Sequence, residues 1–391
     1  MGIMNSRGFC QVLRCSDCAV KFSGRGFSIQ QRTFSSSTTR HRHGAIPAFT
    51  EVSSPELQDL LTRIRERIFL PAHVSPRQRD LIFKAKYKKS LETEPAVAVI
   101  ADEEFTLKHL DLLKDIPSRD KSLREFLALS KEKKDWNNLP SLLGGLMNAK
   151  FIYPRVTLWK IVRAAGIAGR QDTILECLRR VEFTGLTLVD HNFVVQVFIW
   201  LQQKAVSGDW SVEETKKALA WAEIVRDLME EPRSKAPEHI YKYEKKHPTP
   251  GDFGLAKDQP EVAGILLQLA AMRAKQGGAD AEGKVEKYAK ELLGAPLKFK
   301  TVDGGPYTTP GSIHKPNHWL ADHVPVLHGM KVALTLLDPK SAVGRGIKAK
   351  HDELESLLLT VKAHLADATT TSEKPLRGLL SYEKLLGSSS S

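Results

Sequence analysis

Histidine is the residue whose clustering in this sequence could do chemistry most directly, because four imidazoles and one carboxylate fall within 15 residues. These residues are His314, His318, Asp322, His323 and His328. Neutral imidazole is a common zinc ligand in proteins. However, Pro316 argues against the helical turn that would bring the first histidines to one face, and no cysteine partner or HExxH motif accompanies them. We interpret the cluster as capping or surface residues and predict no metal ligand.

A second candidate is the stretch 278–284, which has the glycine and lysine spacing of a phosphate-binding loop. Val285 occupies the place where a Ser or Thr hydroxyl must reach magnesium. Asp280 and Glu282 would face the phosphates and repel them, and no strand pattern precedes the loop. We therefore interpret this stretch as a turn between helices and predict no bound cofactor.

Thiol chemistry is the third candidate, because Cys15 and Cys18 form a CxxC pair. Both residues, and Cys10 before them, lie in an N-terminal segment that we expect to be removed from the mature protein. Cys177 would then remain, at an apolar helical position where a small buried hydrophobe is the ordinary role. No catalytic cysteine is predicted.

The rest of the sequence lacks the patterns of common catalytic sites, including Gly-x-Ser-x-Gly, paired carboxylates and a dinucleotide fingerprint. Four cysteines in 391 residues exclude a secreted disulfide scaffold. The absence of an apolar run of about 18 residues excludes an integral membrane segment. Lys and Arg number 58 against 46 Asp and Glu, for a formal charge of +12. The sequence therefore predicts a basic, intracellular protein that is not an enzyme.

The first 43 residues differ from the rest, with seven basic residues, frequent serine and a single acid, Asp17. This composition is typical of an organelle transit peptide. Arg32 lies two residues before Phe34, which resembles a mitochondrial processing site, so we expect cleavage between Phe34 and Ser35. Residues 1–34 would be the transit peptide and 35–50 a flexible segment, and the mature chain would keep a charge of about +8.

The residues after the leader predict helices almost throughout. In a basic N-terminal region, 51–119, a serine followed by proline at 54–55 and at 75–76 combines an N-cap with a proline at the first helical position. The expected segments of this region are helices at 55–71, 76–89 and 103–115, and a strand or a buried turn at 97–100.

The stretch from 120 to 190 repeats its apolar pattern at a spacing of 35 residues. Phe126 coincides with Ile161, for example, and Leu139 with Ile174. Each unit holds two amphipathic helices, and such hairpins stack because one alone cannot bury both apolar faces. A third unit follows, so we assign 120–231 to helical repeats.

Composition divides the remainder of the chain into three parts. Residues 232–260 hold five prolines among many charges and predict a linker or long surface loop. Helical hairpins are expected over 261–366, with helices near 262–276, 282–293, 317–338 and 341–366. The Ser- and Thr-containing end, 367–391, predicts a disordered tail.

The second repeat unit carries the residues of a recognisable family. Ala168–Arg170 forms its inter-helix turn, Asp172 starts its second helix, and Gly185 closes that helix. This turn, the late glycine and the period resemble those of pentatricopeptide-repeat proteins. The resemblance implies an all-α fold, an α-solenoid of helical hairpins of the pentatricopeptide or tetratricopeptide type, and RNA as a class of partner.

Pentatricopeptide proteins that read RNA by a code use one polar residue early in the first helix and another at the repeat end. The resemblance puts these roles on Lys160 and Asp190 in the clear unit. In the next unit the early place holds Val195, an apolar residue that cannot read a base edge. We therefore expect the hairpins to serve as a platform.

Surface charge is the remaining functional signal. Basic side chains crowd the predicted helix 76–89, where Phe83 and Tyr87 lie between them, and others follow in the repeats. Basic groups neutralise phosphates and aromatic faces can stack on unpaired bases, although a solvated helix with inward aromatics has the same pattern. The candidate nucleic-acid contacts are Arg77, Arg79, Lys84, Lys86, Lys88, Lys89, Lys160, Arg163 and Arg170.

Together these features predict a non-enzymatic helical-repeat protein of the mitochondrial matrix that acts in organelle gene expression. Its expected partner is mitochondrial RNA or the mitochondrial ribosome. The alternative is a protein-binding scaffold, such as an assembly factor for a respiratory-chain complex, that holds its protein partner in the repeat groove. Basic residues along one contiguous face favour the first hypothesis, and an apolar or acidic groove favours the second.

Overall fold

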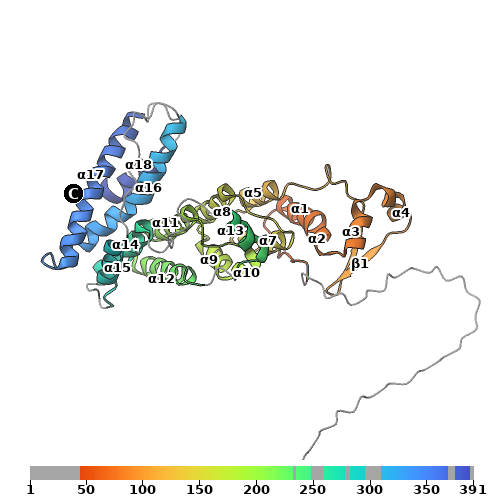
Figure 1. Ribbon diagram of the computed structural model, residues 1–391, viewed down its shortest axis with the longest axis horizontal. Helices are drawn as coiled ribbons and strands as arrows, with labels where there is room; N and C mark the ends of the chain where they lie inside the picture. The colour runs from red at the N-terminus through yellow and green to blue at the C-terminus, as the bar shows by residue number, and fades with distance from the viewer. Residues whose placement is uncertain are drawn as a thin grey trace, which may run out of the picture. The chain divides into compact units, whose positions relative to one another are not determined.

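The computed structural model describes residues 45–231, 235–247, 259–277, 280, 282–295, 310–368 and 375–387 (Figure 1). These residues are mostly helical, which confirms the expected class, with one two-stranded sheet among them. The predicted transit peptide and its cleavage site at Phe34 and Ser35 lie outside the described residues.

The first helical segment begins where Ser54 caps α1 (Pro55–Ile64) by accepting a hydrogen bond from the backbone N–H of Leu57. It does not end at Pro71, as the sequence predicted. A widened π-helical turn, η1 (Arg65–Phe69), leads directly into α2 (Leu70–His73), which contains that proline. The helical segment continues past Pro71 because the π-helical turn lies just before this proline, which has no backbone N–H to donate.

The basic helix predicted at 76–89 is interrupted. A capping box of Ser75 and Gln78 starts α3 (Pro76–Phe83), but Lys84 is extended, with φ −83° and ψ 119°. A 3₁₀ turn, η2 (Ala85–Tyr87), and a short helix, α4 (Lys88–Thr93), follow. The basic side chains therefore lie on three short pieces.

Residues 97–100 form a strand, and the helix predicted at 103–115 is wrong. The strand β1 (Val97–Ile100) pairs antiparallel with β2 (Glu103–Thr106). Ala101 and Asp102 join them with positive φ values of 49° and 68°, as a tight two-residue hairpin turn requires. Alternate side chains of β1 are buried, which is the period of a strand with one covered face.

The region in which the sequence predicts helical repeats consists of longer helices with additional short helices between them. The elements are α5 (Arg119–Leu129), α6 (Lys133–Trp136), α7 (Leu139–Asn148), α8 (Arg155–Ile167), α9 (Gln171–Arg179), α10 (Val181–Thr184), α11 (His191–Ser207) and α12 (Val212–Leu228). The first helices contact in the order α5, α8, α11, and the second helices in the order α7, α9, α12. Gly185, with φ 70°, ends α10 in the left-handed conformation expected of a helix C-cap.

Two pairs of residues that coincide in the repeat also share their burial. Phe126 and Ile161 are fully buried, and Leu139 and Ile174 are buried at the equivalent places of α7 and α9. Cys177 is buried as well, and burial raises the pKa of its thiol far above the ordinary range. This burial confirms the apolar role predicted for that cysteine.

The segment 232–260, for which the composition predicts a linker or long surface loop, contains a helix, α13 (Glu238–Lys246). The prediction is therefore wrong for the residues of α13. The next hairpin, α14 (Pro260–Gly277) and α15 (Lys284–Gly294), agrees with the predicted pair. The stretch with the spacing of a phosphate-binding loop, 278–284, lies between these two helices in the sequence, and residues 278, 279 and 281 lie outside the described residues.

The C-terminal part consists of α16 (Pro310–Ala333), α17 (Ala342–Ala368), α18 (Arg377–Tyr382) and η6 (Glu383–Gly387). The prediction that Pro316 prevents helix is wrong, because α16 runs through both Pro316 and Pro325. The expected disordered tail likewise holds α18, which packs on α16. Gly378 makes this contact, since its N–H donates to the Asn317 side-chain oxygen over 2.7 Å.

Candidate nucleic-acid interface

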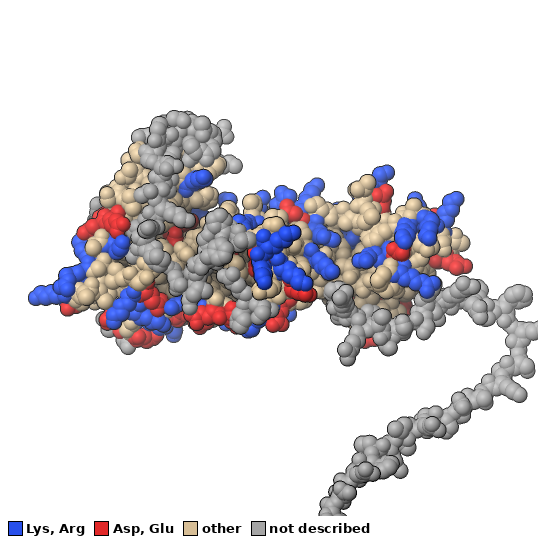
Figure 2. Space-filling model, viewed as in Figure 1, with Lys and Arg blue, Asp and Glu red and all other residues tan. Residues whose placement is uncertain are grey.

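The basic N-terminal module, which we define as residues 76–94, carries six Lys or Arg residues and three acids. Arg77, Arg79, Lys84, Lys86, Lys88 and Lys89 are all exposed. The module is held by its buried apolar residues, Ile82 and Leu91, and by a hydrogen bond from the Leu110 N–H to the Ile82 carbonyl over 2.9 Å. Figure 2 shows Lys and Arg side chains at the place that α3 and α4 occupy in Figure 1.

The module's cations differ in what they contact. Lys84 pairs with Asp80 over 2.6 Å, and the hydrogen bond to that carboxylate raises the pKa of its ammonium. Lys86 lies 4.6 Å above the Tyr87 ring. Arg79, Lys88 and Lys89 have no ion-pair partner among the described residues. These three side chains are therefore the ones available to an outside anion.

In the repeats, Lys160 and Arg163 are exposed on α8, as expected. They share that helix's outer surface with exposed apolar residues, namely Val156, Trp159 and Ile167. Their spacing of three and four residues places these side chains on one face. We call this set the α8 stripe. It combines an indole, two cations and aliphatic side chains.

Arg170 is not a surface contact, and the prediction that it binds nucleic acid is corrected. Only 8% of the residue is exposed. Its guanidinium donates to the Asp172 carboxylate over 3.0 Å, to the Thr173 hydroxyl over 3.1 Å and to the Lys133 carbonyl over 3.4 Å. Arg170 thus joins the turn after α8 to the start of α6.

Asp190 and Val195, two of the three places named by the repeat code, have structural roles. Asp190 caps α11 by accepting a hydrogen bond from the Phe193 N–H over 2.8 Å, and it pairs with Arg155 over 3.4 Å. Val195 is buried within α11. Neither residue can face a base, which agrees with a platform.

The clustered histidines lie in different surroundings. His323 is buried, with Nδ1 2.9 Å from the Trp319 carbonyl and Nε2 3.5 Å from Glu261. His328 lies 2.7 Å from the Gln268 amide and stacks on Trp210. Burial lowers the pKa of His328 to about 4, so its imidazole is neutral at physiological pH. His314 and His318 are exposed, so the surface role predicted for the cluster holds for these two alone.

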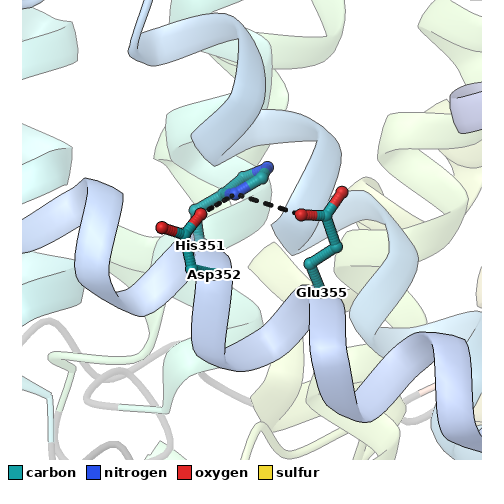
Figure 3. Close-up of side chains that lie close together, drawn as sticks. All are labelled: His351, Asp352 and Glu355. Carbon is teal, nitrogen blue, oxygen red and sulfur yellow. Dashed lines mark hydrogen bonds and ion pairs between the residues drawn. The ribbon is translucent and has the colours of Figure 1, made fainter.

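A group that sequence reasoning missed is His351, Asp352 and Glu355, whose ligand-type atoms lie within 4.8 Å of one another (Figure 3). The His351 Nδ1 is 3.1 Å from Asp352 and 3.9 Å from Glu355. Asp352 also pairs with Lys348 over 2.7 Å. These side chains form a network on α17. The Lys348 ammonium already pairs with the Asp352 carboxylate, which a metal would need as a ligand.

Comparison with known proteins decides the family. The family model for mitochondrial ribosomal protein mS27 matches residues 32–384. The chain belongs to this family. One relative, the small ribosomal subunit protein mS27 of Neurospora crassa, is 32% identical over 275 residues, which is 68% of each chain.

Membership in the mS27 family makes the chain a structural, non-enzymatic component of the mitochondrial ribosome, acting in translation within the mitochondrial matrix. It confirms the predicted function and compartment and decides against a respiratory-chain assembly factor. Within the described part of the chain, no helix is long and apolar enough to cross a membrane.

Proposed function

We propose that the chain is built into the small subunit as a pentatricopeptide-like α-solenoid that serves as a platform. The name of the Neurospora crassa relative supports the choice of subunit. The parallel contact series α5–α8–α11 and α7–α9–α12 supports stacked repeats over 120–231. α14 extends the stack, since it contacts both α11 and α12.

The N-terminal 34 residues act as a transit peptide in this proposal. The family match begins at residue 32, next to the expected cleavage between Phe34 and Ser35, which supports removal of the segment before it. Residues 51–119 then begin the ribosome-bound part of the protein.

The basic N-terminal module contacts ribosomal RNA. The single observation that carries this proposal is the exposure of Arg79, Lys88 and Lys89 without ion-pair partners among the described residues. An exposed cation that is not neutralised locally can replace the counterions of a phosphate, and their release drives binding. The extended residue Lys84 separates α3, which carries Arg79, from α4, which carries Lys88 and Lys89, so these cations do not share one helix face.

Replacing Arg79, Lys88 and Lys89 with glutamate tests this contact. Ultraviolet crosslinking in intact mitochondria is expected to recover about tenfold less RNA with the variant, because three attractive phosphate contacts become repulsive. The matched control changes the exposed lysines Lys216, Lys275 and Lys287 to glutamate, with the same change of net charge. Equal recovery from both variants would remove the module from the RNA interface.

The α8 stripe fits a second role, contact with a neighbouring ribosomal protein. Val156 and Ile167 are 55% and 68% exposed, and RNA offers little to bury such aliphatic side chains. Lys160 and Arg163 between them suit an acidic or amphipathic protein surface.

A further inference from the structure

The helix α13 is an unexpected feature of the chain, because it lies in a proline-rich stretch whose composition predicts a linker. Its sequence, Glu-His-Ile-Tyr-Lys-Tyr-Glu-Lys-Lys from 238 to 246, combines two tyrosines with three lysines. Figure 2 shows Lys and Arg side chains gathered at the place that α13 occupies in Figure 1. The helix belongs neither to the basic N-terminal module nor to the α8 stripe.

Three residues dock α13 onto the repeats. Ile240 is 5% exposed, and the hydroxyl of Thr187 donates a hydrogen bond to the Glu244 carboxylate. His239 lies against the connection between α7 and α8, where burial lowers its pKa and the Lys150 ammonium lowers it further. The helix therefore rests on the α7–α8 connection and on the α10–α11 connection, and its orientation is defined.

This docking points the basic side chains outward. Lys242, Lys245 and Lys246 are exposed on the side opposite Ile240, as the helical period requires. Lys242 pairs with Glu238 over 2.7 Å, whereas Lys245 and Lys246 have no ion-pair partner among the described residues. Lys150, also exposed, adds a further positive charge beside the helix.

Two tyrosines flank these lysines. Tyr241 and Tyr243 are 40% and 44% exposed, so part of each ring is accessible to a partner. Tyr243 contacts His247, with ring centroids 4.7 Å apart. Exposed aromatic rings beside unpaired ammonium groups provide stacking surfaces for bases and charges for phosphates, the two elements of single-strand recognition.

We propose that α13 binds an unpaired segment of ribosomal RNA, with Lys245 and Lys246 on the phosphates and Tyr241 and Tyr243 on the bases. The inference rests on the proposed ribosomal role but adds a second RNA contact on the repeats. A protein partner fits less well, because the outward face of α13 lacks an aliphatic residue to bury.

The test uses small subunits purified from mitochondria that express the tagged full chain. After ultraviolet irradiation and digestion, a peptide covering 238–247 is expected to carry a nucleotide on Tyr241 or Tyr243. Chemical crosslinks from Lys245 or Lys246 to another ribosomal protein, without a nucleotide adduct on this peptide, would overturn the proposal. Absence of the tagged chain from the small subunit would instead contradict the proposed function.

Variants of the purified full chain supply a second measurement, with a fluorescein-labelled oligouridine as the probe. Lys245→Ala with Lys246→Ala is expected to make the slope of log affinity against log salt shallower by about 1.4. Tyr241→Ala with Tyr243→Ala is expected to weaken binding about tenfold. The control, Lys216→Ala with Lys275→Ala, removes two exposed lysines elsewhere. Equal affinities and slopes for all variants, at unchanged helicity, would overturn the proposal.

Discussion

At the residue scale, Asp135 shows how one buried side chain positions the N-terminal segment. Its carboxylate accepts hydrogen bonds from the Ser53 N–H and hydroxyl, each over 2.7 Å, and from the N–H groups of Lys131 and Glu132 over 3.0 and 2.9 Å. Burial alone would raise the pKa of Asp135, but these bonds hold it below its ordinary value. The segment before α1 is therefore tied to α6.

We predict that Asp135→Asn lowers the free energy of unfolding by about 1–3 kcal/mol at pH 7, because the amide presents a donor to backbone N–H groups. A carboxyl whose folded pKa lies below its unfolded value stabilises the fold above that unfolded value, about 4, and loses this contribution as pH falls through the folded pKa. The difference between the two proteins should therefore shrink below about pH 4.

Urea unfolding at pH 7 and at acid pH measures this effect. Asp80→Asn is the control, since that carboxylate forms an exposed pair with Lys84 and should change stability little. A constant difference at every pH would show that the hydrogen bonds of Asp135 do not need its charge.

Residue types alone could predict which side chains are basic, but not which of them face solvent. Arg79 and Lys160 are exposed as expected. Arg170 is instead buried, and its guanidinium forms hydrogen bonds within the protein. Its partner Thr173 is close to it in the sequence, whereas its partner Lys133 is distant. No local sequence pattern could therefore predict the hydrogen bond to the Lys133 carbonyl. That contact forms only when the chain folds and brings α6 to the turn after α8.

At the scale of elements, the contact between α14 and α16 depends on a glycine. A Cβ added to Gly329 would lie 2.9 Å from the Gln268 backbone nitrogen and 2.9 Å from the Gly264 carbonyl oxygen. Backbone atoms of a helix cannot move aside as a flexible side chain can, so the two helices would have to separate.

We predict that Gly329→Ala destabilises the protein by about 1–3 kcal/mol, measured by thermal or urea unfolding. Gly277→Ala, at the end of α14 with open space around it, is the matched control and should be neutral or slightly stabilising. Equal stability of the two variants would contradict the close packing of α14 on α16.

Helices were predicted correctly where the apolar periodicity of the sequence was strong. Prediction of helices and strands failed where tertiary contacts determine the backbone conformation. The hairpins at 120–231 and the α14–α15 pair follow apolar periodicity. The strand β2 was missed because its pairing with β1, not its own residues, makes it extended. The helix α13 was missed because prolines flank it and only Ile240 marks its buried face.

At the scale of the whole molecule, we propose a helical platform that carries RNA contacts on separate basic surfaces. The formal charge of +12 includes seven basic residues and one acid in residues 1–43, which lie outside the described part of the chain. Within the described part, exposed basic side chains lie on the basic N-terminal module, on α13 and, mixed with apolar side chains, on the α8 stripe. A protein embedded in a ribosomal subunit can use each surface for a different neighbour.

Gradient sedimentation of mitochondrial lysate tests the central claim most directly. We predict that the tagged chain sediments with small-subunit ribosomal RNA and moves to lighter fractions after nuclease treatment, because RNA contacts hold it in the particle. Sedimentation apart from ribosomal RNA, whether as free protein or with a respiratory-chain complex, would contradict the account.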